Sequence, residues 1–277
     1  MQNAGIAAVG LNWRYLAFDV KPEDLRTAID GAKAMKFIGL NLTVPHKLLA
    51  LELVDELDTT AATWGAVNTI RFEARRDDGE WTPLAQVPAG EVTELRSVGF
   101  NTDADAVVRA IREDLQIELR GARVLFLGAG GAGRVGALRL AAEGVRELFL
   151  TNRTESKAVE LAAEIRQRFP EVGVSVGYPA GAVNLVVNAT SLGLKPDDGT
   201  PLDPSQFALT NAGAVFDMIY RPAETMLLRT GKAAGCRTAN GLGMLLYQGA
   251  RALEIWSGQS APVEVMRRAL EENVYGK

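Results

Sequence analysis

The sequence predicts an α/β protein of two domains, and three observations support this prediction. The chain has 277 residues, enough for two domains that each bury a core. Segments typical of strands and helices alternate along it, the order expected where helices pack on a mostly parallel sheet. Near the middle, an apolar run at 124–127 leads directly into G-x-G-x-x-G at 128–133 and then into an Ala- and Leu-rich segment.

The glycine motif predicts a dinucleotide site. A glycine-rich turn between a strand and a helix leaves backbone N–H groups at the helix N-terminus, where a pyrophosphate can bind. The motif alone is weak evidence, because glycine turns are common. Here it has the strand before it and the helix after it that such a site requires. The sequence therefore favours a dinucleotide site over a purely structural turn.

Composition excludes several other classes. The net charge of −4 provides no basic surface for nucleic acid or an anionic membrane. Cys236 is the only cysteine and His46 the only histidine, so an internal disulfide, a histidine-triad hydrolase and a Cys/His metal site are not expected. No apolar run reaches 18 residues, and the first residues do not have the charged-then-apolar pattern of a signal peptide, so we expect none. We expect a cytoplasmic protein with no metal, membrane or nucleic-acid partner.

The first hundred residues predict a helix at 1–9, a strand at 15–20 and a helix at 22–35 that begins at a proline. A strand at 37–42, a helix from Pro45 and a strand at 66–72 follow, and together they predict a mostly parallel sheet. The helix from Pro45 has an apolar stripe that includes Leu48 and Leu49. Residues 75–94 contain Pro83, Pro88 and Gly90 and predict a hairpin or an extended surface loop without chemistry.

The second half continues the alternation. Strands are predicted at 147–151, 182–187 and 215–219, and helices at 104–111, 156–169, 241–256 and 261–272. Polar side chains follow the strand at 147–151, namely Asn152, Arg153 and Thr154, with Lys157 one turn later. NAD-binding proteins usually carry an acidic residue at this place, whereas a guanidinium holds a phosphate well. This strand end therefore predicts NADP as the cofactor.

Two stretches of the first half carry chemical groups. In the stretch 41–47, Lys47 lies in a first helical turn, where the helix dipole disfavours a cation, which mildly favours a functional reason for it. Lys47 could also simply be a surface lysine. In the stretch 99–103, Asp103 opens a helix and could serve only as its N-cap.

Taken together and in order, these pieces resemble the shikimate dehydrogenase family over almost the whole chain. The matching motifs are N-x-T-x-P-x-K at 41–47, Gly65-Ala66-Val67-Asn68-Thr69, Asn101-Thr102-Asp103, the glycine loop, Asn152-Arg153-Thr154, Asn188-Ala189-Thr190-Ser191-x-Gly193, Asp217-x-x-Tyr220, and Gly241-Leu242-Gly243-Met244-Leu245 followed by Gln248. Eight motifs in one order are far more specific than any one of them.

The resemblance implies two α/β domains flanking a cleft and NADP-dependent interconversion of 3-dehydroshikimate and shikimate. The substrate domain would comprise 1–103 and 242–277, with the C-terminal helices returning to it, and a Rossmann-like NADP domain would comprise 104–241. A small-molecule substrate is implied, in a protein that is a monomer or a homodimer.

The resemblance also implies roles for particular residues of this chain. Lys47 and Asp103 would form the catalytic pair, and our hypothesis is that Lys47 transfers the proton. The substrate would contact Thr43, Asn68, Asp103, Tyr220 and Gln248. The cofactor would contact Gly128, Gly130, Gly131, Ala132 and Gly133 at the pyrophosphate, Asn152, Arg153, Thr154 and Lys157 at the adenosine 2′-phosphate, and Thr190, Ser191, Leu194 and Gly241 on the ribose–nicotinamide side.

The chain departs from the family pattern in three places. The family opens with a strand and a Ser-x-Ser pair that binds the substrate carboxylate, ahead of a Met equivalent to Met1, whereas the first serine here is Ser97. Either that strand precedes the numbered sequence or the protein lacks it. The insertion between Asn68 and Asp103 is longer than usual, and alanines at 104 and 106 stand where the family often has glycines.

Three alternatives stay open at this stage. A quinate or aminoshikimate dehydrogenase would share most motifs, although NAD-using quinate enzymes tend to carry an acid where Arg153 stands. A non-catalytic sensor would bind NADP and a cyclohexane acid but would not need Lys47 and Asp103. A methylene-folate dehydrogenase would not account for the stretches 41–47 and 101–103.

Overall fold

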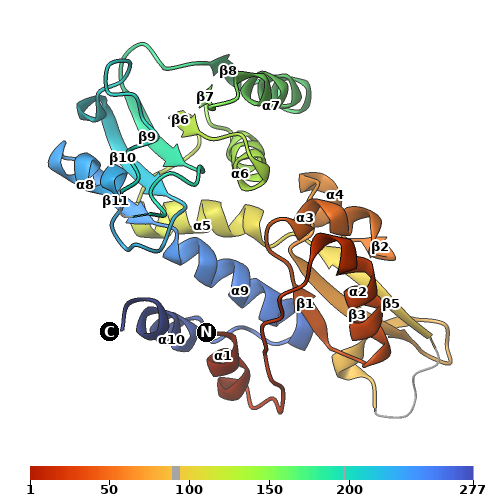
Figure 1. Ribbon diagram of the computed structural model, residues 1–277. Helices are drawn as coiled ribbons and strands as arrows, with labels where there is room; N and C mark the ends of the chain where they lie inside the picture. The colour runs from red at the N-terminus through yellow and green to blue at the C-terminus, as the bar shows by residue number, and fades with distance from the viewer. Residues whose placement is uncertain (89–93, 196, 277) are drawn as a thin grey trace. The chain divides into compact units, whose positions relative to one another are not determined.

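The computed structural model describes residues 1–88, 94–195 and 197–276, which form two compact units (Figure 1). The first comprises Met1–Thr102 together with Leu246–Lys277, and the second comprises Asp103–Leu245. The C-terminal part of the chain, from Leu246, belongs to the first unit. Gly90 lies outside the described residues.

The first unit contains a mixed sheet in the order β1-β3-β5-β2, with β4 paired to β3. Its elements are α1 (Gln2–Ala8), η1 (Pro22–Asp24), α2 (Leu25–Ala34), β1 (Gly39–Asn41), α3 (His46–Leu49), η2 (Ala50–Glu52), β2 (Glu56–Leu57), α4 (Thr59–Trp64), β3 (Thr69–Arg75), β4 (Trp81–Pro83), η3 (Leu84–Gln86), β5 (Glu94–Phe100), α10 (Val263–Tyr275) and the C-terminal part of α9 (Leu242–Ser257).

The expectation of a mostly parallel sheet in this unit is wrong. Strand β3 runs antiparallel to β1, β4 and β5, and among the described residues of this unit only β2 and β5 pair in parallel. Asn41 at the end of β1 pairs with Thr69 at the start of β3, so the chain enters β3 at the same end of the sheet at which it left β1. A parallel pair would need a crossover connection that returns the chain to the opposite end of the strands. The predicted hairpin is present, because β3 and β4 are antiparallel neighbours.

Two local predictions in this unit also fail. Residues 15–20 belong to none of the described strands, and Leu16 and Phe18 are 66% and 63% exposed. Strand propensity alone does not supply a neighbouring strand, and without one the segment forms no ladder. The helix from Pro45 is a single turn, α3, followed by η2, and Leu48 and Leu49 of its apolar stripe are exposed.

The C-terminal helix α9 packs directly on the sheet of the first unit. The indole Nε1 of Trp256 donates to the carbonyl of Ile70 in β3 at 2.9 Å. This close approach requires Gly39 in β1, because a Cβ there would lie 2.1 Å from that Nε1 atom and 2.4 Å from the Ile70 carbonyl oxygen. The absence of a side chain at Gly39 therefore allows α9 to pack closely on the sheet.

The second unit is a fully parallel six-stranded sheet in the order β11-β10-β9-β6-β7-β8. Its elements are α5 (Asp103–Leu115), β6 (Arg123–Leu127), α6 (Gly131–Ala142), β7 (Glu147–Thr151), α7 (Glu155–Arg168), β8 (Gly173–Val176), β9 (Val183–Asn188), η4 (Leu209–Asn211), β10 (Ala212–Asp217), α8 (Met226–Ala233), β11 (Arg237–Asn240) and the start of α9. The strand order changes direction between β6 and β9, the arrangement in which ligands bind beyond the carboxyl ends of the strands.

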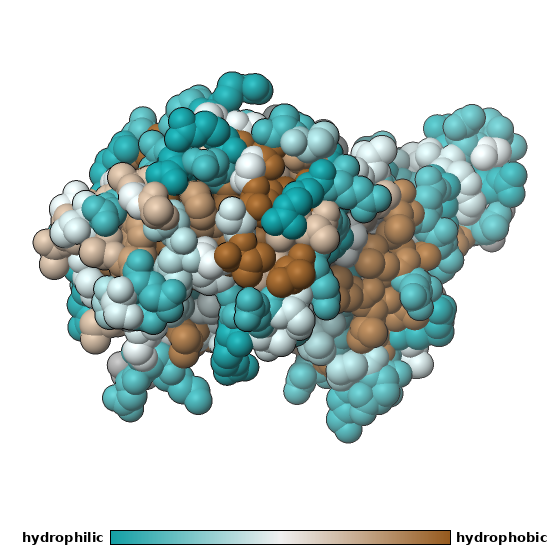
Figure 2. All heavy atoms as spheres, turned by 90° about the horizontal axis from the view of Figure 1, so that it is seen from above, coloured by the Kyte–Doolittle hydropathy of each residue, from teal (hydrophilic) through white to brown (hydrophobic). Residues whose placement is uncertain are grey.

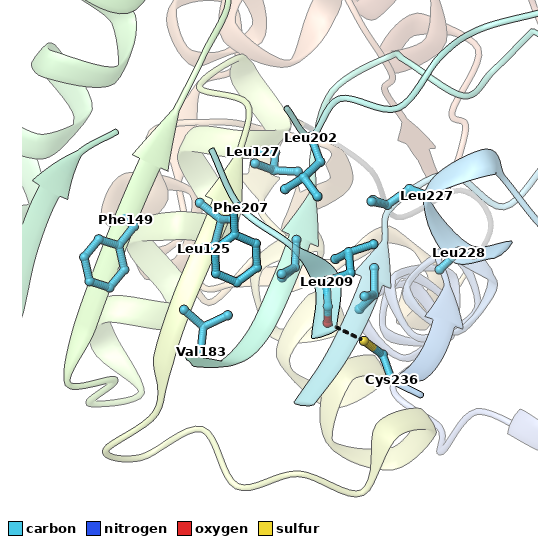
Figure 3. Packing of buried hydrophobic residues seen from close by; sticks show 12 residues of the cluster. Leu125, Leu127, Phe149, Val183, Leu202, Phe207, Leu209, Leu227, Leu228 and Cys236 are labelled. Atoms are coloured by element: carbon cyan, nitrogen blue, oxygen red, sulfur yellow. Dashed lines mark hydrogen bonds between the residues drawn. The ribbon is translucent and has the colours of Figure 1, made fainter. Parts of the chain in front are cut away.

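Apolar side chains from several strands and loops of this unit form one core (Figure 3). Phe149, Leu125 and Val183 come from neighbouring strands, and Phe207 and Leu209 come from the segment before β10. Cys236 belongs to this core and donates its thiol to the carbonyl of Leu209 at 3.2 Å. Burial raises the pKa of the Cys236 thiol. The single cysteine is therefore a packed core residue, as its small apolar character suggests.

Hydrophilic side chains cover much of the face shown in Figure 2, with hydrophobic side chains between them. In the first unit, the exposed large hydrophobic residues include Leu16, Phe18, Met35 and Val44. No helix among the described residues is long and apolar enough to cross a membrane.

Candidate functional site

The glycine loop joins β6 to α6, and its glycines have separate roles. Gly128 has a φ of +109°, a backbone conformation that residues other than glycine rarely adopt. A Cβ on Gly133 would lie 2.3 Å from the carbonyl oxygen of Gly128, so this glycine allows the helix to approach the strand. A Cβ on Gly130 or Gly131 would meet nothing within 4 Å. Open space beside backbone N–H groups at the start of α6 fits a pyrophosphate.

The end of β7 is tied to the glycine loop by Asn152. Its Oδ1 accepts from the backbone N–H of Ala129 at 3.0 Å, and its Nδ2 donates to the carbonyl of Thr154 at 2.7 Å. Arg153 and Lys157, like Thr154, are exposed. Asn152 thus holds the loop and the strand end in register. The two cations follow β7, where the sequence predicts the contacts to the 2′-phosphate of NADP.

The segment after β9 is ordered by the side chain at the strand's end. Asn188 is fully buried, and its Oδ1 accepts from both the backbone N–H and the hydroxyl of Thr190, at 2.9 and 2.7 Å. Ser191 and Leu194 are exposed. The residues expected on the ribose–nicotinamide side therefore lie on a short segment that begins at the carboxyl edge of the parallel sheet.

Tyr220 and Gly241 lie next to this edge in the second unit. Tyr220 follows β10 by three residues and is 37% exposed. Gly241 is buried, and a Cβ there would lie 2.0 Å from the Met218 carbonyl oxygen. Its N–H donates to the carbonyl of Ile219 at 3.1 Å. Close backbone packing therefore accounts for the glycine at 241, whatever contact it makes with a cofactor.

In the first unit, polar side chains at three strand ends form one hydrogen-bonded group. We call it the strand-end cluster, and its members are Asn41, Asn68, Thr69 and Thr102. Asn68 is 2% exposed, and its Oδ1 accepts from the Thr102 backbone N–H at 2.8 Å and from the Thr69 hydroxyl at 3.2 Å. Its Nδ2 donates to the Thr102 hydroxyl at 2.9 Å. One amide hydrogen is then left to offer to a ligand.

The strand-end cluster fixes the backbone just before Asp103. Thr102 is bonded to Asn68 through both its N–H and its hydroxyl, and the Nδ2 of Asn101 donates to the Ala66 carbonyl at 2.9 Å. Asp103 is the first residue of α5 and is half-buried. The helix start that carries this carboxylate is therefore held by buried amide groups.

The stretch 43–47 is anchored on both sides. The backbone N–H of Val67 donates to the carbonyl of Lys47 at 2.9 Å, next to the strand-end cluster. The Nε2 of His46 lies 2.9 Å from the Val20 carbonyl, which can only accept, so this nitrogen carries the proton. Thr43 is exposed and Lys47 half-buried. The one histidine thus holds the segment in place, next to the lysine.

Tyr15 is a residue of this region that sequence reasoning missed. Its hydroxyl donates to Asn41 Oδ1 at 3.0 Å, and its ring lies 6.1 Å from that of Trp256. Burial raises the pKa of the Tyr15 hydroxyl, which keeps it protonated as a donor. The sequence placed Tyr15 in a strand, and no local pattern indicates that it reaches residue 41.

The predicted residues fall into the two units as follows. Thr43, Lys47, Asn68 and Gln248 lie in the first unit, with Gln248 half-buried in α9. Asp103, Tyr220 and all the expected cofactor residues lie in the second unit. Within the described parts of the chain, no group of three or more His, Cys, Asp or Glu side chains could hold a metal ion.

The parallel sheet with its glycine loop and basic strand end defines an NADP-type dinucleotide-binding α/β protein. Family models described as shikimate dehydrogenase substrate binding domain, shikimate / quinate 5-dehydrogenase and shikimate 5′-dehydrogenase C-terminal domain match residues 1–70, 110–175 and 241–271. A shikimate dehydrogenase (NADP⁺) of Methanopyrus kandleri is 38% identical over 281 residues, which cover 99% of this chain and 90% of the relative. The chain belongs to the shikimate dehydrogenase family.

Solved structures agree with this assignment. A crystal structure of a shikimate dehydrogenase in complex with NADP⁺ matches with a TM-score of 0.81 at 35% identity, covering 98% of this chain and 89% of that one. The Thermus thermophilus enzyme in complex with NADP(H) and shikimate matches with a TM-score of 0.79 at 32% identity, covering 98% and 92%. The expected fold class is confirmed. A quinate dehydrogenase from Corynebacterium glutamicum in complex with NAD also matches, with a TM-score of 0.78 at 30% identity, covering 96% and 91%.

Proposed function

We propose that this protein is an NADP-dependent dehydrogenase that interconverts 3-dehydroshikimate and shikimate. The observation that carries the proposal is the whole-chain similarity to relatives of that name, together with the glycine loop and a strand end that presents Arg153 and Lys157. Relatives from Desulforamulus reducens and Moorella thermoacetica share the name, at 39% and 41% identity.

The second unit is proposed as the NADP-binding domain. The N–H groups at Gly130, Gly131 and Ala132 would bind the pyrophosphate, because no side chain fills the space beside these glycines. Arg153 and Lys157, with Asn152 and Thr154, would bind the adenosine 2′-phosphate through charge-assisted hydrogen bonds. Thr190, Ser191, Leu194 and Gly241 would border the ribose and nicotinamide. When bound, NADPH supplies the hydride for ketone reduction.

The first unit is proposed as the substrate domain, and Asp103 and Tyr220 are proposed as further substrate contacts. Reduction of a ketone requires a proton at the developing alkoxide, and Lys47 is the proposed donor. Asp103 would accept from a substrate hydroxyl and orient the Lys47 ammonium. Thr43, Asn68, Tyr220 and Gln248 would hold the substrate's hydroxyl and carboxylate groups. The buried Asn68 amide suits this role, because its Oδ1 already accepts from Thr102 and Thr69 while its Nδ2 has a second hydrogen to donate.

The test is an absorbance assay of the reduced nicotinamide with four substrate and cofactor pairs. Shikimate and quinate are each mixed with NADP⁺ and with NAD⁺. We expect turnover with shikimate and NADP⁺ to exceed the other three. Preference for quinate with NAD⁺ would identify a quinate dehydrogenase instead. Binding of NADP⁺ and shikimate without turnover in any mixture would identify the non-catalytic sensor.

We also propose a cytoplasmic protein that is a monomer or a homodimer and binds no nucleic acid. The net charge of −4 argues against nucleic-acid binding, and the single, buried cysteine fits a reducing compartment. Sedimentation analysis of the purified chain tests the oligomeric state, and a trimer or larger assembly would contradict it.

A further inference from the structure

Two neighbouring strands of the second unit end on buried polar residues that are bonded to each other. Asn188 ends β9 and Asp217 ends β10, and they are ladder partners. Both are 0% exposed, and Asn188 Nδ2 donates to Asp217 Oδ1 at 2.9 Å. A buried carboxylate is costly unless its hydrogen bonds are made, so its bonding partners indicate what it supports.

On one side, the pair orders the segment after β9. Besides the bonds from Thr190 to its Oδ1, Asn188 donates from Nδ2 to the carbonyl of Leu192 at 3.2 Å. The Thr190 hydroxyl in turn accepts from the backbone N–H of Leu192 at 3.1 Å. Thr190 to Leu192 are thus fixed by a single amide side chain, and that amide is held in place by Asp217.

On the other side, Asp217 orders the segment after β10. Its Oδ1 also accepts from the backbone N–H of Ile219 at 3.0 Å, directly before Tyr220. Its Oδ2 accepts from the Thr225 hydroxyl at 2.6 Å, and Thr225 caps α8 through the backbone N–H of Leu228. Burial raises the pKa of Asp217, and the hydrogen bonds from Thr225, Ile219 and Asn188 oppose this rise.

We propose that Asp217 is a positioning residue that sets the nicotinamide-side segment at 190–192 and the Tyr220 segment in one fixed arrangement. The proposal rests on the proposed function, because it takes Thr190 and Ser191 as cofactor contacts and Tyr220 as a substrate contact. Asp217 itself is fully buried and is not proposed as a contact of either ligand. It acts through Asn188 and through the backbone of Ile219.

The experiment compares Asp217→Ala and Asp217→Asn with the full-length wild type. Asp217→Ala removes both acceptors, and we expect kcat for shikimate oxidation to fall about tenfold to a hundredfold, the scale of small displacements at a reacting centre. Asp217→Asn retains an Oδ1 that can accept from Asn188 and Ile219, so it should recover most of kcat. Affinity for 2′,5′-ADP should stay unchanged in both, because β6 and β7 carry the adenosine-side groups and β9 separates them from β10.

Asp203→Ala is the matched control. Asp203 lies in the same unit, and its carboxylate also accepts three hydrogen bonds, two from Ser205 and one from Gln206. We expect this variant to keep wild-type kcat. If Asp217→Ala does not fold, Thr225→Val against Thr225→Ser provides the same comparison, because only the serine can still donate to Asp217.

Several outcomes would overturn the positioning role while leaving the proposed function intact. One is an unchanged kcat in Asp217→Ala. Another is a loss of 2′,5′-ADP affinity that accompanies the loss of kcat, because it would indicate a general structural role. A third is a kcat in Asp217→Asn as low as that in Asp217→Ala. Equal kcat in the two Thr225 variants would also count against it. A wild type without turnover on shikimate would overturn the proposed function and this role with it.

Discussion

The two sheets of the chain bring functional groups together in different ways. In the second unit all five strand pairs are parallel, so β6, β7, β9 and β10 end at one edge. In the first unit, β3 runs antiparallel to β1 and β5, so residues before β3 meet residues after its neighbours. The strand-end cluster is the result, and it joins Asn68 to Thr102.

This difference determines how well each candidate site can be predicted from the sequence. In a parallel sheet, the residues after each strand form the ligand edge, so a sequence motif and its location coincide. In the antiparallel sheet, one end of the sheet carries both residues that follow a strand and residues that precede one. Asn68 precedes β3, so a search for polar residues after strands does not identify it. In the proposed function, the second unit binds its ligand with backbone N–H groups at a glycine loop, whereas the first unit uses side-chain amides, hydroxyls and an amine. We therefore expect chemistry to depend most on the first unit, and cofactor choice on the second.

The largest expected effect tests the chemistry assigned to Lys47. Lys47→Ala should lower kcat by about 10²- to 10⁴-fold, the range for loss of a general acid. Lys47→Arg should stay low as well, because a guanidinium keeps its charge but does not release its proton. Steady-state kinetics with shikimate and NADP⁺ measure both, and Lys21→Ala, at an exposed lysine of the same unit, is the control. A loss confined to KM would remove Lys47 from the proton step.

The next effect concerns cofactor choice in the second unit. Arg153→Ala should raise the KM for NADP⁺ by about 10- to 100-fold, equivalent to one or two hydrogen bonds to a charged phosphate. The KM for NAD⁺, which has no 2′-phosphate, should change little. Arg146→Ala is the matched control, because Arg146 is an exposed arginine just before the opposite end of β7. Equal rises for NADP⁺ and NAD⁺ would place Arg153 outside the 2′-phosphate site.

A smaller effect tests how α9 seats on the antiparallel sheet. Gly39→Ala forces a Cβ into Trp256 and the Ile70 carbonyl and should reduce the free energy of unfolding by about 1–3 kcal/mol. Gly31→Ala, within α2 and with nothing inside 4 Å of its Cβ, should be neutral or stabilise by about 0.5–1 kcal/mol. Urea unfolding compares the two variants. Similar stability in both would show that the sheet accommodates a side chain at residue 39.

The smallest effect is a pH dependence in the first unit. Partial burial raises the pKa of Asp55, but hydrogen bonds from Lys33 and Ser97 outweigh it and lower that pKa below its usual value. A lowered folded-state pKa stabilises the protein above about pH 4, and this contribution is lost as the pH falls below that value. Asp55 is 46% exposed, so the contribution should stay under about 1 kcal/mol.

The measurement for Asp55 is urea unfolding of wild type and Asp55→Asn between pH 7 and pH 3. We expect the wild type to be the more stable at pH 7 and the difference to shrink toward pH 3. A difference that grows as the pH falls would contradict the assigned direction of the Asp55 pKa.

The sequence by itself determined the features that depend on neighbouring residues. The sequence alone predicted the glycine loop, the cations after β7, the helix start at Asp103 and the order of the motifs. Turn chemistry and short spacings determine these features locally. The same information failed at 15–20, where strand propensity was present but no neighbouring strand followed.

Only the tertiary structure decided what depends on residues far apart in the chain. It showed that the first sheet is largely antiparallel, that Tyr15 reaches Asn41, and that Trp256 closes on Gly39. It also showed that the buried Asp217 accepts a hydrogen bond from Asn188, 29 residues earlier. Strand pairing and helix seating bring these groups together, and no local pattern records which distant partner a strand or a helix will find.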